Sequence, residues 1–327
     1  MKQRMLGANG FEVSEVGLGC WQLGADWGAA LAEETALAIL QSAHEQGVTF
    51  FDTANVYGAG KSEELIGKFL KMNPSADIRV ATKFGRGEVY PDGYTQDSLM
   101  SGIDASRKRL GMDCLDLVQL HCIPTEVMRQ GAIFDWLREL QAKDVIRHFG
   151  ASVETVEEGL MCIKEEGLLS LQVIYNLFRQ KLTTELLPEA QAKGVGIIVR
   201  LPLASGILSG KFSAGTTFAE DDHRNYNRDG QAFNVGETFA GVPFETGLQL
   251  VEELKSMMPE GMSMAEAAQR WILDHEAVST IIPGASKPEQ AARNAAISSL
   301  PSLPDNLHRE LITFYEDKIA QHVRGAY

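Results

Sequence analysis

The feature that most constrains the fold is a regular alternation of short apolar runs with longer amphipathic stretches. Eight apolar runs occur, and each is followed by a stretch whose apolar residues have helical spacing. The runs are apolar throughout rather than at alternate positions, which is typical of parallel strands covered on both faces. The predicted strands are 16–19, 48–52, 78–84, 115–121, 146–152, 171–176, 195–201 and 279–284.

Eight strand–helix units predict an α/β fold, the (β/α)8 or TIM barrel. A chain of 327 residues has the length of one such barrel, so we expect a single domain over 1–327. Asn9-Gly10 between two short runs predicts an N-terminal β-hairpin. An amphipathic stretch at 307–323 predicts a C-terminal helix. The polar segment 211–244 is long enough to predict a functional loop.

A doubly wound nucleotide-binding fold is the competing interpretation. Gly17 and Gly19 follow the first run, and Asp52 ends the second, where a ribose-binding acid would lie. The next glycine does not complete the G-x-G-x-x-G spacing, and Asp52 lies too far downstream, so the barrel is favoured. The segment 58–62, GAGKS, resembles the end of a phosphate-binding loop, but Asn55 stands where its first glycine is required.

Charge and composition argue against several classes of function. The net charge is −14 at pH 7, so we expect neither nucleic-acid binding nor membrane binding, because phosphate would be repelled. No run of about 18 apolar residues and no signal-peptide pattern is visible. The four cysteines lack paired spacing, which favours a cytoplasmic location. The seven histidines show no metal-binding spacing, so no metal is expected.

Polar side chains stand at or near the predicted carboxyl ends of six strands. In a barrel these ends form one mouth, where active sites lie. Asp52, Lys83 and His121 end three successive runs, and Tyr57 lies in the loop after the first. The other three are Ser152, Gln172 and Arg200. Each residue alone has a structural explanation, such as a turn or core packing, but their coincidence at successive strand ends favours catalysis.

The first four residues combine into a proton-transfer site. An unperturbed phenol has a pKa near ~10, which is too high for easy proton exchange at neutral pH. A nearby ammonium group lowers that pKa, and a carboxylate keeps a buried ammonium charged. We therefore expect Asp52 to hold Lys83, and Lys83 to lower the pKa of Tyr57. Tyr57 then protonates a carbonyl oxygen that also accepts a hydrogen bond from His121, as reduction by hydride transfer requires.

The sequence resembles the aldo-keto reductase family along nearly its whole length. The segments that carry the resemblance include GLGCWQLG, FFDTANVYG, ATKFG, LVQLH and IIPGASKPEQAARN. The resemblance implies a (β/α)8 barrel and a nicotinamide cofactor, usually NADPH, with NADH as the alternative. It also implies that Asp52, Tyr57, Lys83 and His121 form the catalytic tetrad. In that tetrad Tyr57 is the general acid.

The resemblance further assigns residues to the nicotinamide. Ser152 and Gln172 match positions that hold its carboxamide, whereas Val153 stands where the family commonly has Asn. Arg200 stands where many members place an aromatic ring on the nicotinamide. A guanidinium group is planar and can stack there, or it can reach a phosphate, and both interpretations stay open.

Two segments resemble the parts of the family that hold phosphate groups. The segment 203–211 resembles the loop over the pyrophosphate, and 284–294 resembles the adenosine-phosphate site at a helix start. The residues assigned from them are Leu203, Ser205, Gly206, Leu208, Lys211, Gly284, Ser286, Lys287, Gln290 and Asn294. Ser286 and Lys287 would meet a 2′-phosphate, and the last two residues the adenine. A solvated helix-start lysine is the competing interpretation of Lys287.

The remaining expectations concern the substrate pocket. Trp21 follows the first strand and is expected to line it, while Trp27 and Tyr90 either join it or pack in surface loops. Cys122 follows His121 and is expected to be a small buried apolar side chain rather than a redox switch.

The function that the sequence favours is an NADP(H)-dependent oxidoreductase that reduces aldehydes or ketones and reversibly oxidises alcohols or sugars. Two alternatives remain. One is a regulatory subunit that binds the cofactor without catalysis, because FFDTANVYGAGKSEE resembles a family branch of channel subunits. The other is a barrel lyase or isomerase with a Schiff base on Lys83. We expect a monomer or small homo-oligomer.

Overall fold

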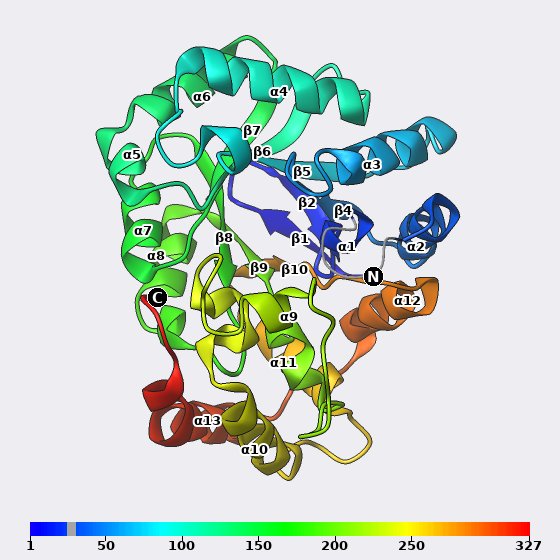
Figure 1. Cartoon of the computed structure of the whole chain (residues 1–327), viewed down its shortest axis with the longest axis vertical. Helices are drawn as coiled ribbons and strands as arrows, with labels where there is room; N and C mark the ends of the chain where they lie inside the picture. The colour runs from blue at the N-terminus through cyan, green and yellow to red at the C-terminus, as the bar shows by residue number, and fades with distance from the viewer. Residues whose placement is uncertain (25–30) are drawn as a thin grey trace.

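The computed structural model describes residues 1–24 and 31–327 and has a (β/α)8 barrel of TIM type (Figure 1). The sheet of the described residues has eight parallel strands in the sequential order β3 to β10. They are β3 (Leu18–Gly19), β4 (Phe50–Asp52), β5 (Arg79–Phe84), β6 (Leu115–His121), β7 (Ile146–Ser152), β8 (Leu168–Ile174), β9 (Gly196–Arg200) and β10 (Val278–Ile281). Single bridges from Val16 to Ile281 and from Gly19 to Gly284 join its two edges. The fold class predicted from the alternation is confirmed.

Helices surround the strands, as Figure 1 shows. They are α1 (Trp21–Gly24), α2 (Glu33–Glu45), α3 (Lys61–Met72), α4 (Gln96–Leu110), α5 (Thr125–Gln130), α6 (Ala132–Ala142), α7 (Val156–Cys162), α8 (Leu186–Lys193), α9 (His223–Tyr226), α10 (Phe244–Lys255), α11 (Met264–Leu273), α12 (Pro288–Ala296) and α13 (Asp305–Phe314). No helix among the described residues is both long and apolar enough to cross a membrane.

Local chemistry sets many of the helix boundaries. Thr95, Thr155 and Ser263 each accept from the amide three residues on, and that residue's side chain accepts in return, so each forms a capping box. Gly111 and Gly194 end α4 and α8 in the left-handed conformation, which glycine adopts without strain. The helix α5, which starts after Pro124, was not predicted, and β8 begins three residues before its predicted start.

Along each strand, side chains point alternately outward to the helices and inward to the interior of the barrel. The outward-facing residues pack under the helices in the larger core cluster; they include Phe51, Val80, Val118, Leu120, Phe149, Leu171, Ile197 and Val199. The inward-facing residues form a second cluster, made of Phe50, Ala81, Leu117, Leu169, Ile198 and Ile282 with Leu6 and Val13. The last two belong to the predicted N-terminal hairpin, β1 (Gln3–Leu6) with β2 (Phe11–Ser14). The hairpin therefore plugs the amino-terminal end of the barrel.

The inward-facing positions become polar two residues further along the strands. Phe50, Ala81 and Leu117 are apolar. The residues two positions later on the same strands are Asp52, Lys83 and Gln119, and all three are buried. A polar layer thus lies between the apolar plug and the carboxyl ends of the strands.

The segment 211–244 is folded rather than extended. It contains α9 and two short 3-10 turns, Val235–Glu237 and Phe239–Gly241. Arg324, near the end of the chain, binds it through an ion pair with Asp229 at 2.6 Å and a hydrogen bond from Nε to the carbonyl of Gly241 at 2.8 Å. The loop is therefore held by the end of the chain as well as by its own turns.

A buried ion pair fastens the hairpin to the barrel. Glu15 is fully buried, and its Oε2 accepts from Arg4 Nε at 2.9 Å. The guanidinium of Arg4 also donates to the carbonyls of Leu273 and Val278, at 2.6 and 2.8 Å. Arg270 Nη1 lies 3.6 Å from the other oxygen of Glu15.

We expect Arg4→Met to lower the free energy of unfolding by about 3 kcal/mol, because it leaves the buried carboxylate without its nearest cation. Urea unfolding followed by circular dichroism measures this change. The control is Lys68→Met, which removes an exposed ion pair with Glu33 and should cost less than about 1 kcal/mol. Equal effects of the two variants would contradict the role given to Arg4.

Candidate active site

The structure brings the four predicted tetrad residues together at the carboxyl end of the barrel. Lys83 Nζ donates to Asp52 Oδ2 at 2.5 Å, to the Thr53 carbonyl at 2.8 Å and to the Tyr57 hydroxyl at 3.2 Å. The His121 ring stands edge-on to the Tyr57 ring, with the ring centroids 5.9 Å apart. The geometry that the sequence predicted for these side chains is therefore present.

The loop after β4 turns back so that Tyr57 faces Lys83. The Tyr57 amide donates to the Ala54 carbonyl at 3.1 Å, which closes a tight turn. Gly24 and Gly58 pack backbone against backbone here: a Cβ added to Gly58 would lie 2.1 Å from the Gly24 carbonyl oxygen. Gly58 also has a φ of +60°. The close approach of these two glycines fixes the position of the phenol.

The charges of the tetrad differ in one respect from the expectation. Burial raises the pKa of Tyr57, and the attraction of Lys83 lowers it by less, so the net shift is upward. The expected net lowering of the Tyr57 pKa is therefore wrong: the effect of Lys83 has the predicted sign but is outweighed by burial. Burial also lowers the pKa of Lys83, but Asp52 and Tyr57 together raise it above its usual value. The resting site therefore contains an ammonium and a protonated phenol.

His121 is electrically neutral in this site. Burial holds its pKa well below the usual value, and the cations Lys83, Arg86 and Arg200 push it in the same direction. A neutral imidazole donates one hydrogen bond without adding charge to the mouth.

Two amides occupy the other side of the Asp52 carboxylate. Gln172 Nε2 donates to Asp52 Oδ1 at 2.7 Å, and Gln119 Nε2 donates to the same oxygen at 3.1 Å. Gln172 was predicted from the family resemblance, whereas Gln119 was missed. Gln119 could have been predicted from its position two residues before His121 on the same strand, because residues two apart point to the same side. Ser152 is also buried, with its Oγ 3.5 Å from Cys122 Sγ.

Arg200 is paired with the long loop. Its Nη1 lies 2.5 Å from Glu237 Oε1, and its Nη2 donates to the Val153 carbonyl at 3.4 Å and to Cys122 Sγ at 3.6 Å. Cys122, expected as a simple apolar filler, thus has polar neighbours. Glu237 was not predicted, because no local sequence pattern links it to Arg200.

Three groups near Arg200 have the donor atoms of a metal site. Ligand atoms of Cys122, Glu154 and Glu237 lie within 4.8 Å of one another. However, both carboxylates already form ion pairs. Arg86 Nη2 lies 3.1 Å from Glu154 Oε1, and Arg200 Nη1 lies 2.5 Å from Glu237 Oε1. The carboxylate charges are therefore already balanced by arginine.

The sequence model of the Aldo/keto reductase family matches residues 15–315 of this chain. The chain belongs to the aldo-keto reductase family. Members of this family are oxidoreductases that generally bind a nicotinamide cofactor, so the chain is an enzyme of that class.

Relatives and solved structures agree with this membership. The chain is 28% identical to the aldo-keto reductase YhdN of Bacillus subtilis, over 99% of this chain and 96% of that one. It is 31% identical to a probable voltage-gated potassium channel subunit beta of Oryza sativa, with 93% of each chain covered. Among solved structures, the glycerol dehydrogenase AKR11B4 from Gluconobacter oxydans superimposes with a TM-score of 0.79 at 26% identity, covering 99% and 97% of the chains.

In this aldo-keto reductase, the segment that resembles the pyrophosphate loop contacts the segment 211–244. Ser205 Oγ donates to the Glu237 carbonyl at 2.8 Å, and the amide of Phe239 donates to the same hydroxyl at 3.4 Å. Ser205 and Gly206 both have positive φ values. Of the other predicted residues here, Leu208 is buried, Leu203 is partly buried and Lys211 is exposed.

The residues that resemble the adenosine-phosphate site gather before and on α12. Gln290 Oε1 accepts from the Ser286 amide at 3.0 Å, and Asn294 Nδ2 donates to the Gly284 carbonyl at 3.1 Å. Lys287 is exposed at the N-cap of α12. This arrangement gives an exposed cation beside the positive end of a helix dipole.

The predicted aromatic residues of the pocket have different positions. Trp21 lies with its ring centroid 6.3 Å from that of Tyr57, so it belongs to the mouth. Tyr90 is 48% exposed, with its ring against Arg86, which fits surface packing. Trp27 lies outside the described residues. His223 of α9 was not predicted; its ring centroid is 5.0 Å from that of Trp21.

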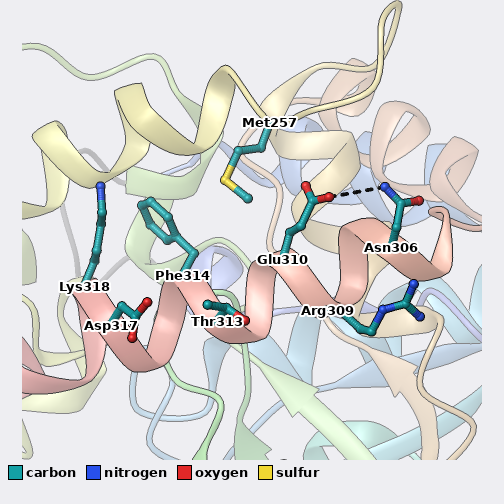
Figure 2. A pocket seen from close by; sticks show the side chains of 8 residues that line it. All are labelled: Met257, Asn306, Arg309, Glu310, Thr313, Phe314, Asp317 and Lys318. Atoms are coloured by element: carbon teal, nitrogen blue, oxygen red, sulfur yellow. Dashed lines mark hydrogen bonds between the residues drawn. The ribbon is translucent and has the colours of Figure 1, made fainter.

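A separate groove lies between α10 and α13 (Figure 2). Its volume is about 530 Å³. It is lined by Met257, Asn306, Arg309, Glu310, Thr313, Phe314, Asp317 and Lys318. The lining contains no tetrad residue and no residue assigned to the cofactor, so the groove is distinct from the candidate active site.

The histidine of α9 makes the long loop sensitive to acid. Burial lowers the pKa of His223 from its usual 6.5 to about 4, although Asp222 acts in the opposite direction. The folded state therefore binds this proton less readily than the unfolded state. The stability that neutral His223 contributes is present above pH 6.5 and is lost as the pH falls toward about 4.

We expect His223→Gln to remove that dependence. Between pH 6.5 and 4, the wild-type protein should lose up to about 3 kcal/mol more unfolding free energy than the variant. Parallel urea titrations at several pH values measure the difference. Curves that fall equally in both proteins would show that the loop does not hold a neutral His223.

Proposed function

We propose that this aldo-keto reductase reduces aldehyde or ketone carbonyls with hydride from NADPH and reversibly oxidises alcohols or sugars, with Tyr57 as general acid. The observation that carries the proposal is the chain of contacts from Asp52 through Lys83 to the Tyr57 hydroxyl. It leaves a protonated phenol at the mouth, beside a neutral imidazole. These are the two donors that a carbonyl oxygen needs as negative charge develops on it.

Features of the structure fit a nicotinamide dinucleotide. Among the described residues, Arg200 Nε is buried without a hydrogen-bond partner, and this guanidinium borders Cys122 and Val153 next to the tetrad. Ser205 and Gly206 have left-handed backbone conformations, and Lys211 follows them. A turn of this kind directs backbone N–H groups toward an anion.

In the proposed reaction each residue of the site has a separate role. When bound, the reduced nicotinamide supplies the hydride. His121 donates a hydrogen bond to the carbonyl oxygen and polarises the C=O bond. As the oxygen gains charge, Tyr57 transfers its proton to it, and Lys83 stabilises the phenolate that remains. Asp52 keeps Lys83 protonated throughout, and Trp21 covers the apolar part of the substrate.

The choice of NADPH over NADH rests on the start of α12. Ser286 and Lys287 stand at the positive end of this helix, where a phosphate is favoured. Lys287 is exposed and available to a ligand. We therefore assign the 2′-phosphate to these two residues.

A regulatory subunit without catalysis is the second candidate. It is favoured by the 31% identity to a probable potassium channel subunit beta. The contacts among Tyr57, Lys83 and His121 favour the enzyme, because a protein that only binds cofactor has no need of an aligned proton donor. A glycerol dehydrogenase among the similar structures fits oxidation of small polyols in the reverse direction.

A Schiff-base lyase is disfavoured by the hydrogen bonds of Lys83. Its three hydrogens point to Asp52, the Thr53 carbonyl and Tyr57. An ammonium held in this way has no lone pair with which to attack a carbonyl.

We expect Tyr57→Phe to lower kcat by at least about 100-fold, because it removes the proton donor and leaves the barrel intact. Cofactor oxidation at 340 nm across aldehydes, ketones and sugars measures turnover, and a fluorescence titration measures NADPH binding. NADPH affinity should change little. Near-normal reduction by the variant would refute the role of Tyr57, and wild-type binding of NADPH without turnover on any substrate would favour the regulatory subunit.

We expect Lys287→Ala to weaken NADPH binding about tenfold while NADH binding stays within about twofold, because only NADPH carries the 2′-phosphate. The control is Lys164→Ala, which removes an exposed lysine after α7. Equal weakening of both cofactors by Lys287→Ala would rule out the assignment.

A further inference from the structure

Gln119 is a neutral amide in the buried polar layer that also contains Asp52 and Lys83. It lies on β6 one period above Leu117 and one period below His121, and it is fully buried. Burying an amide costs free energy unless its hydrogen bonds are made. A side chain that only filled this space would not need the amide, so its hydrogen bonds indicate what it does.

The amide of Gln119 connects two residues of the site. Its Nε2 donates to Asp52 Oδ1 at 3.1 Å, and its Oε1 accepts from Gln172 Nε2 at 3.3 Å. Its Cα also pairs in register with that of Lys83 on the neighbouring strand β5. Gln119 therefore touches the carboxylate on the side opposite Lys83.

Asp52 is held at both oxygens by different partners. Oδ2 binds Lys83, while Oδ1 accepts from Gln119 and Gln172. Gln172 also belongs to the set of residues assigned to the nicotinamide carboxamide, so a bound cofactor competes for it. Gln119 has no such assignment and lies deeper in the strand than His121. It is the donor that can stay on Oδ1 when Gln172 turns to the cofactor.

We propose that Gln119 is a positioning residue that fixes the Asp52 carboxylate against Lys83, so that this ion pair stays beside Tyr57 whether or not the cofactor is bound. It touches neither substrate nor cofactor and acts through Asp52. Its kinetic readout rests on the proposed reductase function, but its effect on Lys83 does not.

The sign of the expected effect follows from the groups that face Lys83. These titratable groups are Asp52 from β4, Tyr57 from the next loop, His121 from β6 and Cys20 after β3. Burial lowers the pKa of Lys83, and the attraction of Asp52 is the largest effect that raises it. Without the hydrogen bond from Gln119, the carboxylate is free to turn away from Lys83, so the attraction that raises the pKa of Lys83 weakens and this pKa falls.

The main test is Gln119→Met, which keeps the approximate volume and removes the amide. We expect kcat for carbonyl reduction to fall roughly tenfold, and the alkaline limb of the kcat profile to move down by about one pH unit. NADPH affinity, from fluorescence titration, should change less than about threefold, whereas Gln172→Met should weaken it at least about tenfold. Leu117→Met, one layer below on the same strand, is the packing control and should leave the alkaline limb in place.

A second measurement is independent of turnover. In protein labelled with ¹³C at lysine Cε, the resonance that disappears in Lys83→Met reports the protonation of Lys83 during an alkaline titration. Its midpoint should move to lower pH in Gln119→Met. Gln119→Asn, whose shorter side chain withdraws the amide from Asp52, should do the same and serves if the methionine variant does not fold.

Two results would overturn the proposal. One is an unchanged Lys83 midpoint in both Gln119 variants with only a lower melting temperature, which would make Gln119 a structural residue. The other is a loss of NADPH affinity in Gln119→Met as large as that in Gln172→Met, which would place Gln119 in the cofactor site. If the wild-type protein binds NADPH but reduces nothing, the proposed function fails, while the NMR titration still decides the role of Gln119.

Discussion

The arrangement of the site depends on one buried ion pair, that of Asp52 with Lys83. The two side chains are 3% and 1% exposed, and an ammonium in such a place is unfavourable unless a carboxylate meets it at hydrogen-bond distance. The barrel meets this requirement by ending β4 with the acid and placing the lysine on the adjacent strand. The phenol of Tyr57 then needs only a tight turn to reach the cation. Breaking the pair would leave a lone charge inside the barrel and would disturb the contact of Lys83 with the Tyr57 hydroxyl.

The interior of the barrel explains how the pair is tolerated. Below it, Phe50, Ala81 and Leu117 close the space with apolar surface, and the hairpin seals the end. Beside it, the amides of Gln119 and Gln172 take the place of water around the carboxylate. Asp52, Lys83, Gln119 and Gln172 therefore each have a hydrogen-bond partner in place of water, which is the condition for burying them.

Most of the architecture could be predicted from the sequence, because apolar runs, helix caps and the period of two act locally. The tetrad followed from the same logic, since strand ends of a parallel barrel share one mouth. The contacts of Arg200 with Glu237 and of Trp21 with His223 were not predictable, because they depend on how 211–244 folds back onto the barrel. The net pKa shift of Tyr57 was expected with the wrong direction, because burial is a tertiary property that the local pattern does not reveal.

The hairpin seal has a consequence for how such a protein can diversify. The ion pair of Arg4 with Glu15 and the apolar plug stabilise the floor of the barrel, while the residues that would meet substrate come from loops at the opposite rim. Because the two ends lie at opposite ends of the same strands, we expect exchange of rim loops to disturb the floor of the barrel little. The rim is accordingly the region to randomise when a new specificity is sought, with the floor left untouched.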